Sequence, residues 1–143
     1  LERIEWKYLR MEGRMGSKNR EVVLPERSAK PLGPYSLGIR TEGFVFASGS
    51  TGIDPASGAL VQGGVEAQTR QALQNLGRVL EAGGSSFKQV VKTTVFLLDM
   101  GDFAKMNQVY ASFFGDEPPA RSTVQVGALP GGASVEIEAI AIG

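Results

Sequence analysis

The feature that most constrains the fold is the run at 90–98, which lies between two stretches of helical periodicity. Its sequence, Val-Val-Lys-Thr-Thr-Val-Phe-Leu-Leu, is rich in β-branched and aromatic residues and predicts a buried strand. Before it, apolar residues recur every three or four positions from Val65 to Ala82, and Gly83-Gly84 follows as a helix C-cap would. After it, residues 102–114 repeat this periodicity. Two amphipathic helices with a buried strand between them indicate an α+β sandwich.

Five shorter segments complete the expected sheet, at 21–24, 37–40, 44–50, 120–126 and 134–141. The resulting order is β-β-β-α-β-α-β-β, and we expect a mixed sheet with two helices packed on one face. We also expect that Thr93, Val95, Leu97 and the alternate residues of the last two segments cannot all face the helices. The bare face then predicts self-association, in the form of a closed cyclic oligomer.

Composition excludes several classes of chemistry. The chain of 143 residues contains no cysteine and no histidine, which removes disulfides, thiolate nucleophiles, Cys/His zinc sites and imidazole catalysis. The net charge is zero, and residues 31–143 alone carry a net −3, so no positive field attracts nucleic acid or an anionic membrane. No apolar run approaches the roughly 18 residues of a membrane span. We expect a cytoplasmic protein, because the lack of cysteine fits a reducing compartment.

Residues 1–20 differ in character from the rest of the chain. They begin with leucine, are rich in charged residues and contain no apolar segment of the kind that a secretory signal requires. We expect a leader that is disordered or of cloning or upstream origin, with a native arm as the alternative. Residues 21–143 are expected to form one domain.

Two charged residues near the C-terminus are candidates for a site. Arg121 follows two prolines and opens a β-branched run, and Glu136 lies in the last expected strand with Glu138 on the same face. Each also has a plain structural interpretation: Arg121 as a surface charge or ion pair, and Glu136 as a solvated strand residue. Glu138 could take the place of Glu136, although a salt bridge or a subunit contact suits it better. Nothing marks Lys92, within the central run, as a Schiff-base lysine.

Seven short motifs, in order and at compatible spacing, resemble the Rid/YjgF family of reactive-intermediate deaminases. The resemblance extends from about Ser28 to the C-terminus. The motifs are Gly33-Pro34-Tyr35-Ser36, Ser48-Gly49, Gly63-Gly64-Val65, Val91-Lys92-Thr93-Thr94-Val95, Asp102-Phe103-Ala104-Lys105-Met106-Asn107, Pro119-Ala120-Arg121-Ser122 and Val135-Glu136-Ile137-Glu138-Ala139.

This resemblance implies a chorismate-mutase-like fold assembled as a homotrimer, with the sheets forming a central barrel and three clefts between subunits. It implies hydrolysis of short 2-imino acids, such as 2-iminobutanoate and 2-iminopropanoate, to 2-keto acids and ammonia, without a metal or an organic cofactor. The expected partners are therefore the small 2-imino or 2-keto acid and two further copies of the chain.

The resemblance also assigns roles by position. Arg121 matches the family's carboxylate-binding arginine and Glu136 the acidic residue near the water, while the other matching cleft residues are Tyr35, Ser48, Gly49, Asn107 and Thr123. Thr123 stands where many relatives have cysteine, so only its backbone groups are expected to serve the site. Ser50 stands where glutamine is common, which leaves the specificity contacts near residue 50 open.

The chemistry suits these residue types. A guanidinium binds a carboxylate bidentately and so fixes the adjacent C=N carbon, and a glutamate can accept a proton from an attacking water. Two other functions remain open. The same cleft could capture a small carboxylate for regulation without turnover, although binding alone would need only the arginine. A nucleic-acid or translation-directed role is disfavoured by the absence of a Lys/Arg cluster.

Overall fold

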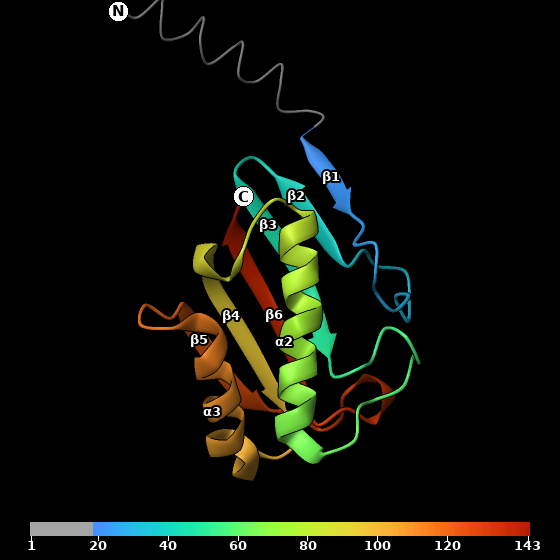
Figure 1. Ribbon diagram of the computed structural model, residues 1–143, viewed down its shortest axis with the longest axis vertical. Coiled ribbons are helices and arrows are strands. Elements are labelled where there is room, and N and C mark those ends of the chain that lie inside the picture. Colours follow the sequence, from blue (N-terminus) through green and yellow to red (C-terminus); the bar gives the residue numbers. More distant parts are fainter. Residues whose placement is uncertain (1–18) are drawn as a thin grey trace, which may run out of the picture.

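A computed structural model describes residues 19–143, which form one six-stranded sheet with two long helices on one side (Figure 1). The elements follow the predicted order. They are β1 (Arg20–Val23), β2 (Gly38–Thr41), β3 (Phe44–Thr51), α2 (Gly64–Ala82), β4 (Val90–Leu97), α3 (Phe103–Phe114), β5 (Ala120–Gln125) and β6 (Val135–Ile142), with short 3-10 turns at Phe87–Gln89, Met100–Asp102 and Pro130–Gly132. Apart from residues 19 and 20, the predicted leader lies outside the described residues.

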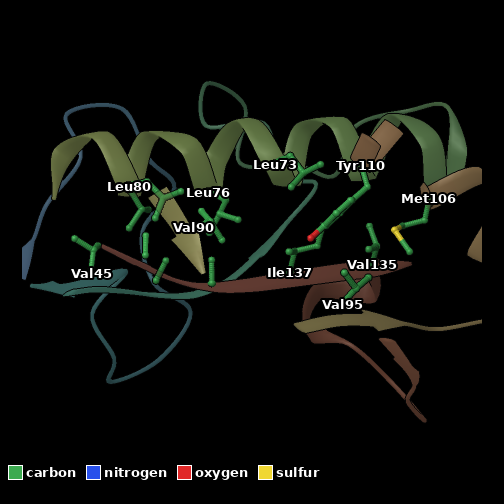
Figure 2. Close-up of a cluster of buried hydrophobic side chains, with 14 of the residues drawn as sticks. Val45, Leu73, Leu76, Leu80, Val90, Val95, Met106, Tyr110, Val135 and Ile137 are labelled. Atoms are coloured by element: carbon green, nitrogen blue, oxygen red, sulfur yellow. The ribbon is translucent and has the colours of Figure 1, made fainter. Parts of the chain in front are cut away.

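The helices form where apolar residues recur at helical spacing, and their apolar stripes face the sheet. On α2 the stripe includes Leu73, Leu76 and Leu80, which are fully buried. Figure 2 shows these side chains pointing from the helix toward Val45 and Ile137 on the sheet. Burial of each such side chain contributes about 1.5–3 kcal/mol. No helix among residues 19–143 is long and apolar enough to cross a membrane.

The strands are arranged in the order β1-β2-β3-β6-β4-β5, so that β1 and β5 form the two edges. All neighbours are antiparallel except β4 and β5, which run parallel and are connected through α3. The pairing of β3 with β6 shifts register between Ala47 and Ser50, which places an extra residue on β3 at Ser48-Gly49. Such bulges bend a strand and re-aim its side chains.

The two faces of the sheet differ in what covers them. Thr93, Val95 and Leu97 are fully buried and face the helices together with the alternate residues of β6, so our expectation that these positions could not all face the helices was wrong. The sequence shows the alternation of a strand, but the helix packing decides which set is covered. The open face instead carries the intervening residues of the strands, among them the exposed Phe44, Phe46, Val124 and Ile142.

Candidate active site

Arg121 lies on the edge strand β5 and is held by helix α3. Its register partner is Thr93, which is fully buried, so its side chain leaves the sheet on the helix side. Arg121 Nη2 donates a hydrogen bond of 2.8 Å to Asn107 Oδ1. The guanidinium carbon lies over the ring of Tyr110, 4.6 Å from its centroid, and 5.6 Å from the centroid of Phe103. The structure therefore brings together Arg121 and Asn107, two residues that the resemblance assigns to the cleft.

Thr123 is two residues further along β5, on the same face as Arg121. Its register partner is Val95, which is fully buried on the helix side, and Thr123 itself is partly exposed. Its position on an edge strand leaves one side of the backbone without a neighbouring strand among residues 19–143. We call Arg121, Asn107 and Thr123 the arginine half-site.

Glu136, on the central strand β6, belongs to a second group of residues around the bulge of β3. A cavity of about 80 Å³ lies where β3 continues beyond the end of β2, and Tyr35, Gly49, Ser50 and Glu136 are among the residues that line it. The other lining residues are Arg27, Ser28, Ala29, Lys30, Leu32, Leu37, Thr51, Ile53, Asn75, Val79 and Pro130. We call Tyr35, Gly49 and Glu136 the glutamate half-site.

Gly49 makes room for the Glu136 carboxylate. A Cβ atom on residue 49 would lie 2.6 Å from Glu136 Cδ and would overlap the carboxylate oxygen Oε1. Since Gly49 lies in the bulge, the bulge and the missing side chain together allow the carboxylate to reach the cavity past the β3 backbone. The resemblance assigns Gly49 to the cleft, and the structure shows its close approach to Glu136.

The environment of Glu136 raises its pKa. The larger cause is partial burial of the carboxyl group, which disfavours its charged form, and the second is the nearby negative charge of Glu138. A carboxyl group with a raised pKa is a stronger base once it has lost its proton, which suits a group that takes a proton from water. Perturbed carboxyl groups that line a cavity are candidates for function.

Substituting Gly49 with alanine tests this arrangement. The added Cβ would force the Glu136 carboxylate out of its position. We expect kcat for the imine hydrolysis that the family resemblance implies to fall by about 10-fold or more, because a displaced base transfers protons poorly. The measurement is steady-state kinetics on Gly49→Ala beside Gly43→Ala. Gly43 lies in the β2–β3 turn with open space around it, so its substitution should leave kcat unchanged even if it costs stability. An unimpaired Gly49→Ala enzyme would contradict the assignment.

Ser48 and Tyr35 have structural contacts of their own. Ser48 Oγ donates a hydrogen bond of 2.7 Å to the Ser36 carbonyl, and the Ser48 amide donates one of 2.9 Å to the Leu37 carbonyl. These bonds attach the bulge of β3 to the segment that carries Tyr35. The Tyr35 hydroxyl accepts a hydrogen bond of 3.2 Å from the Leu32 amide, and 45% of the residue is exposed. Ser48 thus supports the glutamate half-site, whereas Tyr35 lines its cavity.

Two further charged residues of the sheet, Lys92 and Glu138, lie outside both half-sites. Lys92 lies on the open face, where its Nζ donates a hydrogen bond of 2.9 Å to Ser122 Oγ. Glu138 lies beside it, in a hollow of that face rather than in the cavity of Glu136. Among residues 19–143, no group of three or more aspartate or glutamate residues is placed to hold a metal ion.

The two half-sites do not meet within one chain. Arg121 faces the helices, whereas Glu136 alternates with the buried Val135 and Ile137 and leaves the sheet on the opposite face. The strands that hold Arg121 and Gly49 are also separated by β4 and β6, a distance of about 14 Å across three strand spacings. One chain therefore presents Arg121 on the helix side at the β5 edge, and the Glu136 carboxylate on the other face beside the bulge of β3.

Comparison with known proteins agrees with the motifs and the fold. The family model described as Endoribonuclease L-PSP matches residues 26–143. The chain belongs to the Rid/YjgF family. The Rid/YjgF relatives include a RutC family protein of Pyrococcus horikoshii, 50% identical over 85% of this chain and 97% of its own. They also include the 2-iminobutanoate/2-iminopropanoate deaminase of Mus musculus, 47% identical over 90% of this chain and 95% of its own.

A solved structure of the Rid/YjgF family shares the fold. The structure of E. coli TdcF with bound serine superimposes with a TM-score of 0.82, at 36% identity, over 86% of this chain and 98% of the other. The chain therefore has the mixed α+β fold of this family, with a six-stranded sheet and two helices.

Sequence reasoning missed the aromatic residues beside Arg121. The helical periodicity of residues 102–114 places Tyr110 and Phe103 in the apolar stripe of α3, which is correct for Tyr110, since it is 5% exposed. Phe103 is 40% exposed, so it is not a buried core residue, although it belongs to the apolar stripe. The available signal was spacing, because Phe103, Asn107 and Tyr110 recur at three and four residues and so share one side of the helix.

Proposed function

We propose that this protein is an imine deaminase that hydrolyses short 2-imino acids to 2-keto acids and ammonia. The observation that carries the proposal is the pair of half-sites. Arg121, held by Asn107 and Tyr110, is suited to bind a carboxylate, and Glu136, with its raised pKa, is suited to take a proton from water. Relatives that bear the name 2-iminobutanoate/2-iminopropanoate deaminase, at 44–47% identity, support the same reaction class.

In this proposal Arg121 binds the substrate carboxylate. A planar guanidinium holds a carboxylate through two parallel hydrogen bonds of about 2.7–2.9 Å. Among residues 19–143, Asn107 accepts one of the five guanidinium N–H donors, which leaves enough for such a pair. The serine bound in the TdcF structure also carries a carboxylate next to a nitrogen-bearing carbon. A 2-imino acid has the same carboxylate beside the carbon that water attacks.

Glu136 then handles the protons of the reaction. An iminium carbon is electrophilic, so water can attack it without a strong nucleophile. Glu136 accepts one proton from the attacking water and delivers it to the nitrogen of the resulting tetrahedral intermediate. The C–N bond then breaks to release ammonia, and the remaining hydroxyl proton passes through Glu136 to the ammonia as C=O forms, so that an iminium and water become a keto acid and ammonium. Tyr35 lines the same cavity and offers a hydroxyl to the imino acid or to the water.

The active site is completed between copies of the chain. Because Arg121 and Glu136 lie on opposite faces of the sheet, a shared cleft would take the arginine half-site from one copy and the glutamate half-site from its neighbour. The apolar open face favours such association, since Phe44, Phe46, Val124 and Ile142 are each 42–49% exposed in the single chain. Within this proposal the assembly is a closed homotrimer whose open faces form a central barrel.

A coupled assay tests the proposed reaction. A serine or threonine dehydratase generates the imine in the presence of semicarbazide, and keto-acid release is recorded with and without this protein. We expect acceleration that saturates with imine concentration and disappears in Arg121→Ala. Unaccelerated release would contradict the deaminase, and calorimetric binding of 2-ketobutyrate by the same sample would then favour a regulator that only captures small carboxylates.

Ribonuclease activity is the remaining candidate, because the family description names an endoribonuclease. The net charge of −3 over residues 31–143 opposes it, since phosphate-backbone binding relies on clustered lysine and arginine. We expect no salt-dependent binding of single-stranded RNA in a low-salt titration. Binding that weakens with salt, accompanied by cleavage that depends on Glu136, would instead support the ribonuclease.

A further inference from the structure

We propose that Tyr110 is a positioning residue whose ring holds the Arg121 guanidinium in place for the substrate carboxylate. This inference rests on the proposed function and extends it to a residue that does not touch the substrate. Two observations carry it: Arg121 Cζ lies over the Tyr110 ring, 4.6 Å from the centroid, and Tyr110 itself is anchored in the core.

The anchor is a buried hydrogen bond. Tyr110 Oη and Thr93 Oγ1 are 2.7 Å apart, and Thr93 is fully buried on the adjacent strand β4. Figure 2 shows the Tyr110 side chain reaching from α3 toward the sheet, with its hydroxyl in the core. The ring of Phe114, with its centroid 4.4 Å away, packs on Tyr110 as well. Burial raises the pKa of Tyr110, so the hydroxyl keeps its proton at neutral pH.

The face of the Tyr110 ring attracts the Arg121 cation. All five N–H groups of a guanidinium lie in its plane, whereas an aromatic ring attracts the cation through its face. Asn107 Oδ1 accepts one of those donors at 2.8 Å, and Phe103 lies 5.6 Å from the guanidinium carbon. Three residues of α3 therefore fix the position of the guanidinium while most of its donors remain available.

Fixing this side chain matters because Arg121 lies on an edge strand and is partly exposed. A free arginine loses much rotamer freedom when it binds a ligand, and prior ordering removes part of that loss. Cation–π contacts of this kind correspond to roughly a 2- to 30-fold change in an equilibrium. The structure thus assigns to Tyr110 a contribution to carboxylate affinity rather than to proton transfer.

The test compares three variants with the wild-type protein. Tyr110→Leu removes the ring, and Tyr110→Phe keeps the ring but removes the bond to Thr93. Phe113→Leu makes the same aromatic-to-leucine change on α3 at a residue that packs on Phe87. We expect Tyr110→Leu to raise both the Kd for 2-ketobutyrate and the KM for imine by about 10-fold, with kcat within about 2-fold. Tyr110→Phe should change both by less than about 3-fold.

Two readouts separate positioning from core stability. Phe113→Leu should lower the melting temperature as much as Tyr110→Leu yet leave the Kd unchanged. The Arg121 Nε–H signal in the ligand-free protein should lose its ring-current shift only in Tyr110→Leu. Equal Kd values for Tyr110→Leu and wild type, or an equal rise in Phe113→Leu, would overturn the proposal.

The binding measurement also keeps this inference distinct from the proposed reaction. Wild-type protein that binds 2-ketobutyrate but releases no keto acid from imine would contradict the deaminase. The Kd values of the Tyr110 variants would still test whether Tyr110 positions Arg121. Wild-type protein that fails to bind 2-ketobutyrate would overturn both proposals, since Arg121 would then hold no carboxylate.

Discussion

Replacing Arg121 with alanine is expected to lower kcat/KM for imine hydrolysis by roughly 100-fold or more, because two charge-assisted hydrogen bonds to the substrate carboxylate disappear. The fold should tolerate the change, since Arg121 is partly exposed on an edge strand and its side chain hydrogen-bonds to Asn107 rather than to a core residue of the sheet. The measurement is keto-acid release in the coupled assay, together with the melting temperature.

A matched variant shows whether this loss is specific. Arg40→Ala removes another arginine from a strand, β2, where the side chain is exposed, and should retain wild-type kinetics. Arg121→Lys keeps the charge but loses the planar fork, so an intermediate kcat/KM is expected. Arg121→Ala with activity within about 2-fold of the wild type would contradict the role of Arg121 in binding the carboxylate.

Replacing Glu136 with glutamine is expected to lower kcat by about 100- to 10,000-fold, the range that general acid–base catalysis contributes. The Kd for 2-ketobutyrate should change by less than about 3-fold, because the arginine half-site is intact. Glu138→Gln is the matched control, since Glu138 lies two residues along the same strand and was the alternative candidate. A large loss of kcat in Glu138→Gln with full activity in Glu136→Gln would mean that Glu138, rather than Glu136, transfers the protons.

The pH dependence of activity follows from the raised pKa of Glu136. Its deprotonated form accepts the proton, so kcat should fall as the pH is lowered through this pKa, which burial and Glu138 raise above the ordinary 4.5. Removing the charge of Glu138 removes one of the two causes, so Glu138→Gln should move this fall to lower pH. A pH–rate profile on both proteins checks the direction, and an unmoved acid limb would contradict the coupling.

Lowering the pH through this pKa should lower kcat but favour the folded state. A carboxyl group whose pKa is raised by folding favours the folded state below its ordinary pKa, and this contribution is lost as the pH rises through the raised value. Glu136→Gln has no charge to bury, so at neutral pH it should melt at the same temperature as the wild type or higher. This would separate its loss of activity from a loss of folding.

The order of elements could be predicted from the sequence because local signals agreed along the chain. The helical periodicity from Val65 ends at a glycine pair, and the run at 90–98 has the β-branched composition of a buried strand. Which set of alternate residues faces the helices depends on packing between distant segments, and there our expectation for Thr93, Val95 and Leu97 was wrong.

The candidate site was predictable only in part, for a similar reason. The motifs indicated Arg121, Asn107, Gly49 and Glu136. In the structure Arg121 donates a hydrogen bond to Asn107, and Glu136 closely approaches Gly49. The contact between Arg121 and Tyr110 depends on how α3 lies against β5. From the sequence alone, a buried tyrosine in an apolar stripe is predicted to be a core residue. Contacts between elements are absent from local sequence patterns, so the aromatic support was not foreseen.

The claim that one active site draws on two chains can be tested most directly with mixed oligomers. Arg121→Ala and Glu136→Gln proteins, each inactive alone, are unfolded, mixed in equal amounts and refolded together. In a closed ring with random mixing, about one quarter of the clefts would pair an intact Arg121 with an intact Glu136 of the neighbouring copy. A cleft shared between two copies predicts recovery of about one quarter of wild-type kcat per chain. A refolded mixture that assembles normally but remains as inactive as its parents would contradict it.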